Sequence, residues 1–134
     1  MHVLLSIKPE FVERIFAGEK KFEYRKAIFR RSGVEKVIIY STLPEGKVVG
    51  EFSIDKILTD TPQKIWSQTR SKSGINKEFF DDYFDGRTEA HAIKIGNVRK
   101  YINPFKLADM KEKVSAPQSF KYLSCELLPE LAFE

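Results

Sequence analysis

The residues best suited to chemistry lie in one short stretch, residues 18–25, with the sequence GEKKFEYR. Within it, Lys20, Lys21 and Arg25 stand among the carboxylates of Glu19 and Glu23. A lysine can bind a phosphate or, if desolvated, act as a base, and a guanidinium paired with a carboxylate can hold a planar anion. We therefore predict that this stretch contacts a polar or anionic ligand.

Glu23 and Arg25 are two residues apart, so their side chains share one face if the stretch is a strand. Their alternation with Phe22 and Tyr24 predicts a strand over residues 20–26 with one face on the core and the charged face free. Glu23 could orient the arginine for an anion or accept a hydrogen bond from the amino group of a base. A purely structural ion pair is the alternative.

Two further groups are candidate ligand contacts. Arg30 and Arg31 form a basic–aromatic cluster with Phe29 in a predicted loop, a composition used to contact nucleic-acid backbones and stack on bases. Tyr40 and Ser41 end a predicted interior strand, where hydroxyls at a barrel mouth can contact a ligand. The alternatives are solvated arginines and ordinary hydrogen bonding at a strand end.

The elements that must position these residues are short. We predict strands over residues 3–7, 20–26, 37–40, 47–57, 90–95 and 98–102, and helices over residues 9–17, 62–66 and 77–84. A turn is predicted at Gly96-Asn97, and the segment 120–128 is predicted to be partly helical. Aromatic side chains at helical spacing are expected in the core: Trp66, Phe79, Phe80, Tyr83 and Phe84. This order predicts an α+β fold, a small mixed β-barrel with inserted short helices.

Composition narrows the classes of function. The 134 residues predict a single domain, residues 1–134, and the net charge of +4 favours an anionic partner. A lone cysteine, Cys125, excludes an internal disulfide and is expected to be a buried small hydrophobe. With two histidines and no metal-ligand spacing, we expect neither a metal nor a cofactor. No apolar run could span a bilayer and no signal peptide opens the chain, so a cytoplasmic location is expected.

The charged stretch resembles the GxKxxExR motif of the ASCH family, a branch of the PUA-like barrels, with Gly18, Lys20, Glu23 and Arg25 at the motif positions. The resemblance extends over nearly the whole chain and includes residues 5–9, 40–50, 83–93 and 117–120. It implies a PUA-like barrel with a cleft near the motif, and a role in binding RNA or a modified nucleoside.

Some members of the family are enzymes. One branch resembles an amidohydrolase acting on N4-acetylcytidine, whose motif lysine, a threonine and a later glutamate carry the reaction, and another member is a ribonuclease. Here Glu23 occupies the place of the threonine, which weighs against the amidohydrolase. Glu78 and Glu89 both remain candidates for the later glutamate.

We therefore predict a protein that binds RNA, or a nucleoside or nucleotide, at a basic cleft and acts in RNA metabolism or in transcriptional or translational regulation. The predicted ligand contacts are Lys20, Glu23, Arg25, Arg30, Arg31, Tyr40 and Ser41. One alternative is a small hydrolase, either a nucleoside amidohydrolase or a ribonuclease, with Lys20 and a carboxylate such as Glu23 as catalytic groups. A second alternative is a protein-interaction module in which the motif is only structural.

Overall fold

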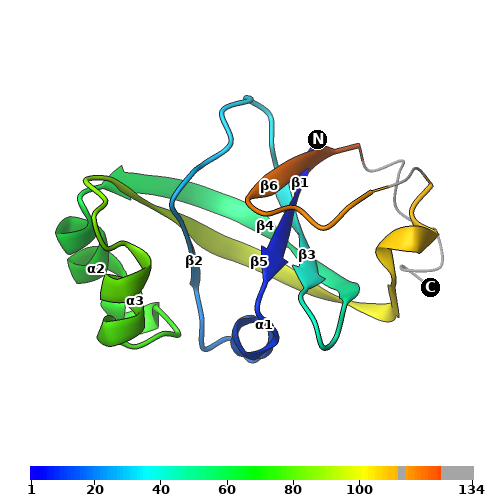
Figure 1. Ribbon diagram of the computed structural model, residues 1–134, viewed down its shortest axis with the longest axis horizontal. Coiled ribbons are helices and arrows are strands. Elements are labelled where there is room, and N and C mark those ends of the chain that lie inside the picture. Colours follow the sequence, from blue (N-terminus) through cyan, green and yellow to red (C-terminus); the bar gives the residue numbers. More distant parts are fainter. Residues whose placement is uncertain (112–113, 125–134) are drawn as a thin grey trace.

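The computed structural model describes residues 1–111 and 114–124, and these residues form an α+β fold with a six-stranded mixed sheet and three α-helices (Figure 1). The strands are β1 (His2–Ile7), β2 (Phe22–Arg25), β3 (Lys36–Ser41), β4 (Lys47–Asp60), β5 (Ala90–Phe105) and β6 (Phe120–Leu123). The helices are α1 (Pro9–Phe16), α2 (Pro62–Thr69) and α3 (Lys77–Tyr83), with short 3-10 turns η1 (Arg70–Lys72) and η2 (Leu107–Asp109).

The order of the strands across the sheet is β2-β5-β4-β3-β1-β6. β1 and β3 are parallel, and every other neighbouring pair is antiparallel. Parallel neighbours need a crossover connection, and here the connection contains α1 and β2. The crossover therefore brings the charged motif from the end of α1 to the far edge of the sheet.

The sheet is covered by separate apolar clusters. Val12 and Ile15 of α1 pack with inward side chains of β1 and β3, in a cluster that includes Leu5 and Ile39. A second cluster lies under α2 and α3, which Figure 1 shows grouped at one end of the sheet, and there Phe80 contacts side chains of β2 and β5.

The predicted alternation in β2 is confirmed, since Phe22 and Tyr24 both pack in the cluster under α2 and α3. The prediction that the opposite face is free is wrong: Glu23 is 6% exposed and the Arg25 side chain 11%. Arg25 reaches backbone carbonyls of β1 and of Ser119, so this face is covered by the other end of the sheet.

Helices α2 and α3 each begin at a capping side chain. The Thr61 side chain accepts a hydrogen bond from Lys64 N at the start of α2, and the Asn76 side chain accepts one from Phe79 N at the start of α3. The predicted interior strand is β3, which lies between β1 and β4. The pairing of β4 with β5 has a register shift between Val48 and Gly50.

The predicted turn at Gly96-Asn97 is wrong, because β5 runs unbroken through both residues. Gly96 is required there by a close approach: a Cβ at this position would lie 2.5 Å from Ser53 Oγ. The same hydroxyl accepts a hydrogen bond from Asn97 N at 2.8 Å, so the two strands stay joined at this point.

The C-terminal prediction is also corrected. Residues Phe120–Leu123 form strand β6, which pairs antiparallel with β1, so the part of 120–128 that is described is not helical. Cys125 and the remaining residues of that segment lie outside the described residues. The strand order ends at β2 and β6, so the fold is a six-stranded mixed sheet and the predicted closure into a barrel is not shown.

Candidate functional site

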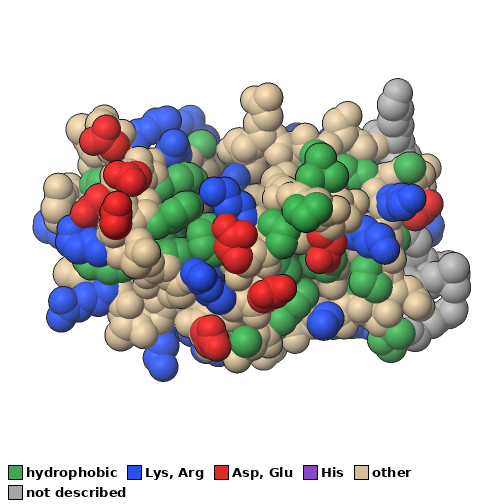
Figure 2. Space-filling model, turned by 60° about the horizontal axis from the view of Figure 1, so that its bottom comes forward, with side chains coloured by type: hydrophobic (Ala, Val, Ile, Leu, Met, Phe, Trp, Pro, Cys, Tyr) green, Lys and Arg blue, Asp and Glu red, His purple; other side chains and the backbone are tan. Residues whose placement is uncertain are grey.

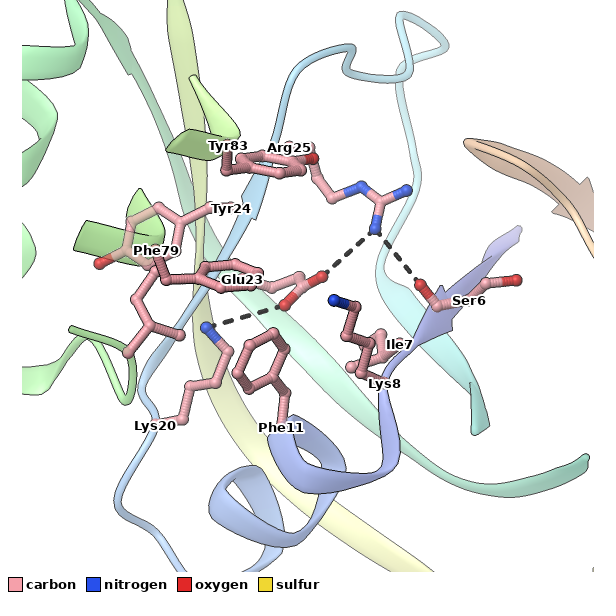
Figure 3. Close-up of a pocket in the computed structure, with 11 residues that line it drawn as sticks. Ser6, Ile7, Lys8, Phe11, Lys20, Glu23, Tyr24, Arg25, Phe79 and Tyr83 are labelled. Atoms are coloured by element: carbon pink, nitrogen blue, oxygen red, sulfur yellow. Dashed lines mark hydrogen bonds and ion pairs between the residues drawn. The ribbon is translucent and has the colours of Figure 1, made fainter. Parts of the chain in front are cut away.

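A cavity of about 180 Å³ lies between the motif strand β2, the β1–α1 junction and α3 (Figure 3). It is smaller than the roughly 300–1,000 Å³ of a typical small-molecule pocket. Its lining consists of Ser6, Ile7, Lys8, Phe11, Lys20, Glu23, Tyr24, Arg25, Ile75, Phe79 and Tyr83. Three basic side chains and one acidic one line it, so the pocket itself is basic. The wider face in Figure 2 mixes both signs of charge with hydrophobic side chains.

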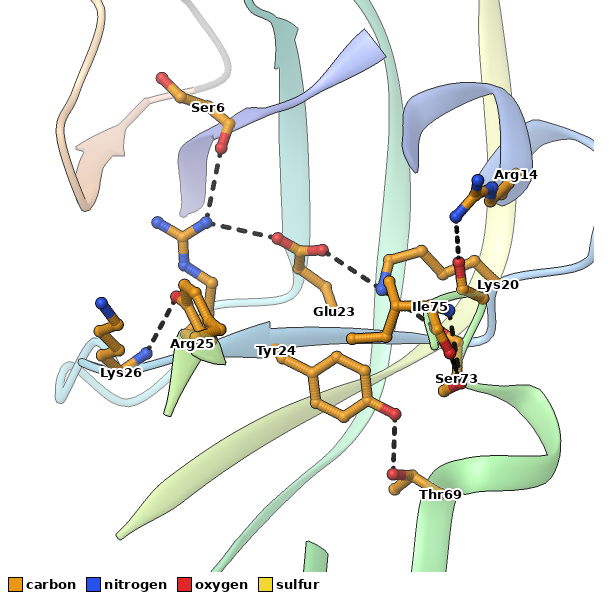
Figure 4. Close-up of polar contacts among 12 residues, drawn as sticks. Ser6, Arg14, Lys20, Glu23, Tyr24, Arg25, Lys26, Thr69, Ser73 and Ile75 are labelled. Atoms are coloured by element: carbon orange, nitrogen blue, oxygen red, sulfur yellow. Dashed lines mark hydrogen bonds and ion pairs between the residues drawn. The ribbon is translucent and has the colours of Figure 1, made fainter. Parts of the chain in front are cut away.

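The three charged motif residues form one row in this pocket (Figures 3 and 4). Lys20 Nζ lies 3.8 Å from Glu23 Oε1, and Arg25 Nη1 lies 3.3 Å from Glu23 Oε2. Lys20 is 2% exposed, so all three charges are largely removed from water. In such surroundings an acid and a base can exchange protons with a bound molecule without competition from bulk solvent.

The burial of Lys20 has a local and a long-range cause. Gly18, with φ at 78°, ends α1 and turns the chain so that Lys20 N donates to Arg14 O. The long-range cause is the α2–α3 connection, where Gly74 packs against the stem of Lys20. Lys20 Nζ donates a hydrogen bond to Ser73 O at 3.2 Å in the same connection.

Burial lowers the pKa of the Lys20 ammonium from its ordinary value, because the charged form is deprived of water. The Glu23 carboxylate acts in the opposite direction and Arg14 adds to the lowering. The Lys20 ammonium also lies 4.8 Å from the centroid of the Tyr24 ring. Lys20 is therefore a better proton donor than an exposed lysine, and it retains partners for its charge.

Arg25 links the motif strand to the other end of the sheet. Its Nη1 donates to Ser6 O at 3.4 Å and its Nη2 donates to Ser119 O at 2.6 Å. Ser6 in turn donates from its Oγ to Pro117 O at 2.8 Å. Side chains of β1 and β2 thus hold the segment before β6 against the pocket rim.

Tyr24 forms a wall of the pocket. Its hydroxyl donates to Thr69 Oγ1 at 2.7 Å, and burial raises its pKa to about 12. The phenol is therefore protonated across the neutral range and serves as a fixed part of the wall.

The predicted contacts Arg30 and Arg31 lie outside the pocket lining. Their backbone N–H groups donate to the Tyr122 hydroxyl at 3.0 and 3.1 Å, and the Arg31 guanidinium lies 4.5 Å from the centroid of the Tyr122 ring. Phe29 is buried against Phe120, so it is unable to stack on a ligand in this arrangement. The two arginines remain an exposed basic pair beside β6.

Tyr40 and Ser41 also lie outside the lining. Tyr40 packs in an apolar cluster with Val48 and Tyr101. Ser41 is completely buried, and its Oγ has no hydrogen-bond partner among the described residues. The structure therefore brings together Lys20, Glu23 and Arg25, and separates them from the other four predicted contacts.

Several pocket residues were missed by the sequence reasoning. Phe79 and Tyr83 were predicted to be core with Phe80 and Phe84, but they line the pocket, whereas the other two are buried under α3. Phe79 and Tyr83 are four residues apart and share one face of the helix, whereas Phe80 and Phe84 share the adjacent face. This difference could have distinguished the pocket pair from the core pair.

Lys8, at the pocket lip, was also missed as a candidate. Glu78 and Glu89 are absent from the lining, and Glu89 instead lies 3.5 Å from His91 Nε2.

The described residues contain no cluster of three or more His, Cys, Asp or Glu side chains that could hold a metal ion. Within the same described part of the chain, no helix is long and apolar enough to cross a membrane.

The fold and the site together define a small α+β domain with a basic pocket around a buried lysine–glutamate–arginine row. Residues 5–124 match the model of the ASCH domain, and the chain belongs to that family.

The similar proteins differ in how much of their own length the match covers. The chain is 28% identical over 126 residues to an ASCH domain-containing ribonuclease of Zymomonas mobilis, covering 92% of this chain and 84% of that protein. It is also 36% identical to part of the ATP synthase subunit alpha and 30% identical to part of the large ribosomal subunit protein uL22, both of Ureaplasma parvum. Each match covers 90% of this chain, but the chain spans only 15% and 39% of those two proteins.

A crystal structure of ASCH from Zymomonas mobilis superposes with a TM-score of 0.85 at 25% identity, covering 93% of this chain and 89% of that one. A structure of a tyrosine-to-phenylalanine variant of the Zymomonas protein also gives a TM-score of 0.85, at 24% identity, covering 93% and 91% of the two chains. The similarity to this variant structure shows a shared fold and nothing more.

Proposed function

We propose that this domain is a ribonuclease that binds one nucleotide of an RNA chain in its pocket, with Lys20 and Glu23 as the acid–base pair. The observation that carries the proposal is the buried contact of opposite charges, 3.8 Å apart, in a cavity open to a ligand. The similarity to an ASCH domain-containing ribonuclease over most of that protein's length supports it and favours cleavage over binding alone.

The reaction we propose is an attack of the ribose 2′-oxygen on the adjacent phosphorus. Glu23 takes the proton of the 2′-hydroxyl as the new P–O bond forms, and the P–O bond to the 5′-oxygen breaks. Lys20 gives its proton to the leaving 5′-oxygen, which yields a 2′,3′-cyclic phosphate and a free 5′-hydroxyl. Because the two groups are 3.8 Å apart, the proton on Glu23 can then return to the Lys20 amine.

The other basic residues offset phosphate charge in this proposal. Arg25 is fixed by Ser6 and Ser119, so its guanidinium needs little reorganisation when charge develops on the phosphate. Arg30 and Arg31 lie outside the pocket and extend the positive field for neighbouring phosphates.

The size of the cavity supports a single nucleotide as the part that enters. At about 180 Å³ it suits one base with its sugar at the mouth and is too small for a base pair. We further propose that the whole chain is one PUA-like domain. The Arg25 links from β2 to Ser6 of β1 and to Ser119 support a partial barrel closed through side chains.

A second candidate function is binding of RNA or of a nucleotide without cleavage, in RNA metabolism or its regulation. It is supported by one observation: backbone carbonyls of the protein hold Lys20 and Arg25 in place. Side chains held in this way lower the entropic cost of binding a ligand, and binding alone needs no proton transfer.

The test is cleavage of a fluorescently labelled RNA, measured in buffers with and without Mg²⁺. Lys20→Met and Glu23→Gln should each lower the rate by about 100-fold or more while leaving the fold intact. The exposed neighbours in the same stretch provide matched controls, and Lys21→Met and Glu19→Gln should cleave like the wild type.

The outcomes separate the candidates. A wild type that binds RNA and leaves it intact would select the binding function. Unchanged cleavage by Lys20→Met would reject the acid–base assignment. If a variant lacking both Glu23 and Arg25 binds and cleaves RNA normally but melts early, the motif is structural, as expected for a protein-interaction module.

A further inference from the structure

Two aromatic rings of α3 lie parallel to each other at the pocket. Phe79 and Tyr83 are four residues apart and so lie on one face of the helix. Their rings are within 10° of parallel, with centroids 6.4 Å apart, and both line the pocket. Figure 3 shows the two rings one above the other, on the same side of the pocket.

The rings are spaced as an offset-parallel pair, for which centroids typically lie about 4.5–7 Å apart. Both side chains are half-buried, so each ring keeps part of its surface open at the pocket. A planar guest can therefore stack on the exposed part of either ring without the two rings being parted.

Each ring is held in place by a second contact. Phe79 meets the edge of Phe11, with centroids 5.1 Å apart and planes at 80°. Tyr83 meets Phe84 in the same manner at 4.8 Å and 77°, and its hydroxyl accepts a hydrogen bond from Lys26 N at 3.3 Å. The pair is thus pre-organised, which lowers the entropic cost of binding a ligand.

A cation accompanies each ring. Lys8 Nζ lies 5.1 Å from the centroid of Phe79, and Lys26 Nζ lies 4.7 Å from the centroid of Tyr83. Aromatic rings beside cationic side chains are typical of nucleic-acid binding sites, where the rings stack on bases and the positive charge attracts the backbone.

We propose that Phe79 and Tyr83 form a stacking surface for the planar base of a nucleotide whose sugar and phosphate lie at Lys20, Glu23 and Arg25. The nature of the guest rests on the proposed function, but stacking itself does not require cleavage. Every base has a flat face, so the stacking surface should bind all four bases with similar affinity.

The test uses 2-aminopurine riboside 5′-monophosphate, whose fluorescence is quenched on stacking. Phe79→Leu and Tyr83→Leu should each weaken its binding by about 5- to 150-fold. The ring-preserving variants Phe79→Tyr and Tyr83→Phe should bind within about threefold of the wild type. A matched control is Phe16→Leu, which removes another half-buried aromatic ring with a cation near it, outside the pocket, and should have no effect.

Ribose 5-phosphate, which lacks a base, serves as the competitor for the wild type and should compete at least about fivefold more weakly than the nucleotide. Equal competition would overturn the stacking surface even if a leucine variant failed to fold. Folded leucine variants with wild-type affinity, or a wild type that does not bind the probe, would also overturn it. If the wild type stacks the probe but does not cleave RNA, the ribonuclease is rejected and the stacking surface stands. If the wild type cleaves RNA and the leucine variants bind the probe fully, the stacking surface is rejected and the ribonuclease stands.

Discussion

Replacing Lys20 by methionine should change how the stability of the fold depends on pH. Lys20 is 2% exposed, and burial lowers the pKa of its ammonium in the folded protein below the ordinary value of 10.5. Methionine keeps most of the apolar stem that packs against Gly74 and removes the charge. The variant therefore isolates the cost of burying the ammonium.

The sign of the effect follows from proton counting. Between the lowered folded pKa and 10.5, the unfolded chain holds the Lys20 proton and the folded protein does not. Wild-type stability relative to the variant should therefore rise with pH in this window, by at most about 1.36 kcal/mol per pH unit. Below the folded pKa both states hold the proton, and the difference between the two proteins should be constant.

The raised pKa of Tyr24, about 12, produces a separate loss of stability above pH 10 in both proteins, so it cancels in the difference. Urea unfolding at constant ionic strength, from neutral pH to pH 10.5, measures the free energy of unfolding of each. With a urea dependence of about 1–3 kcal/mol per molar, the steepest part of the rise shifts the relative midpoint by about 0.5–1.4 M per pH unit.

Lys21→Met is the matched control, since Lys21 is exposed and adjacent, and its stability difference from the wild type should stay flat. A difference for Lys20→Met that is equally flat, or that falls with pH, would refute the view that Lys20 is a buried cation weakened by desolvation.

Two further perturbations test the rest of the site. Arg25→Lys keeps the charge but loses the guanidinium fork that reaches Ser6 O and Ser119 O. Thermal unfolding should therefore show that the free energy of unfolding falls by about 1.5–3 kcal/mol. A melting temperature equal to that of the wild type would mean that the side chain does not join the ends of the sheet. Ser41→Ala removes a buried hydroxyl without a partner among the described residues, so the free energy of unfolding should be unchanged or rise by about 1 kcal/mol, with RNA affinity unaffected. A loss of RNA affinity in that variant would restore Ser41 as a ligand contact.

The motif shows which structural features a local sequence pattern can predict. The alternation of Phe22 and Tyr24 with Glu23 and Arg25 correctly predicted a strand with two chemically different faces, because side chains on a strand point alternately to opposite sides. The caps at Thr61 and Asn76 are also local features, since a capping side chain binds backbone N–H groups only a few residues away.

Contacts between distant segments decided the rest. Lys20 is buried because Ser73 and Gly74, more than 50 residues further along, pack on it, and no local pattern contains that information. The continuation of β5 through Gly96 depends on Ser53 of the neighbouring strand in the same way. β6 is a strand because β1 offers it a partner.

The sequence by itself determined which residue types could form a charged site and which of them share a strand face, because both depend on spacing along the chain. Only the tertiary structure decided that this face is buried, that Phe79 and Tyr83 belong to the pocket, and that Tyr40 and Ser41 do not. Burial and pocket membership depend on which distant segments meet, and here the crossover through α1 brings β2 to face α3 and β1.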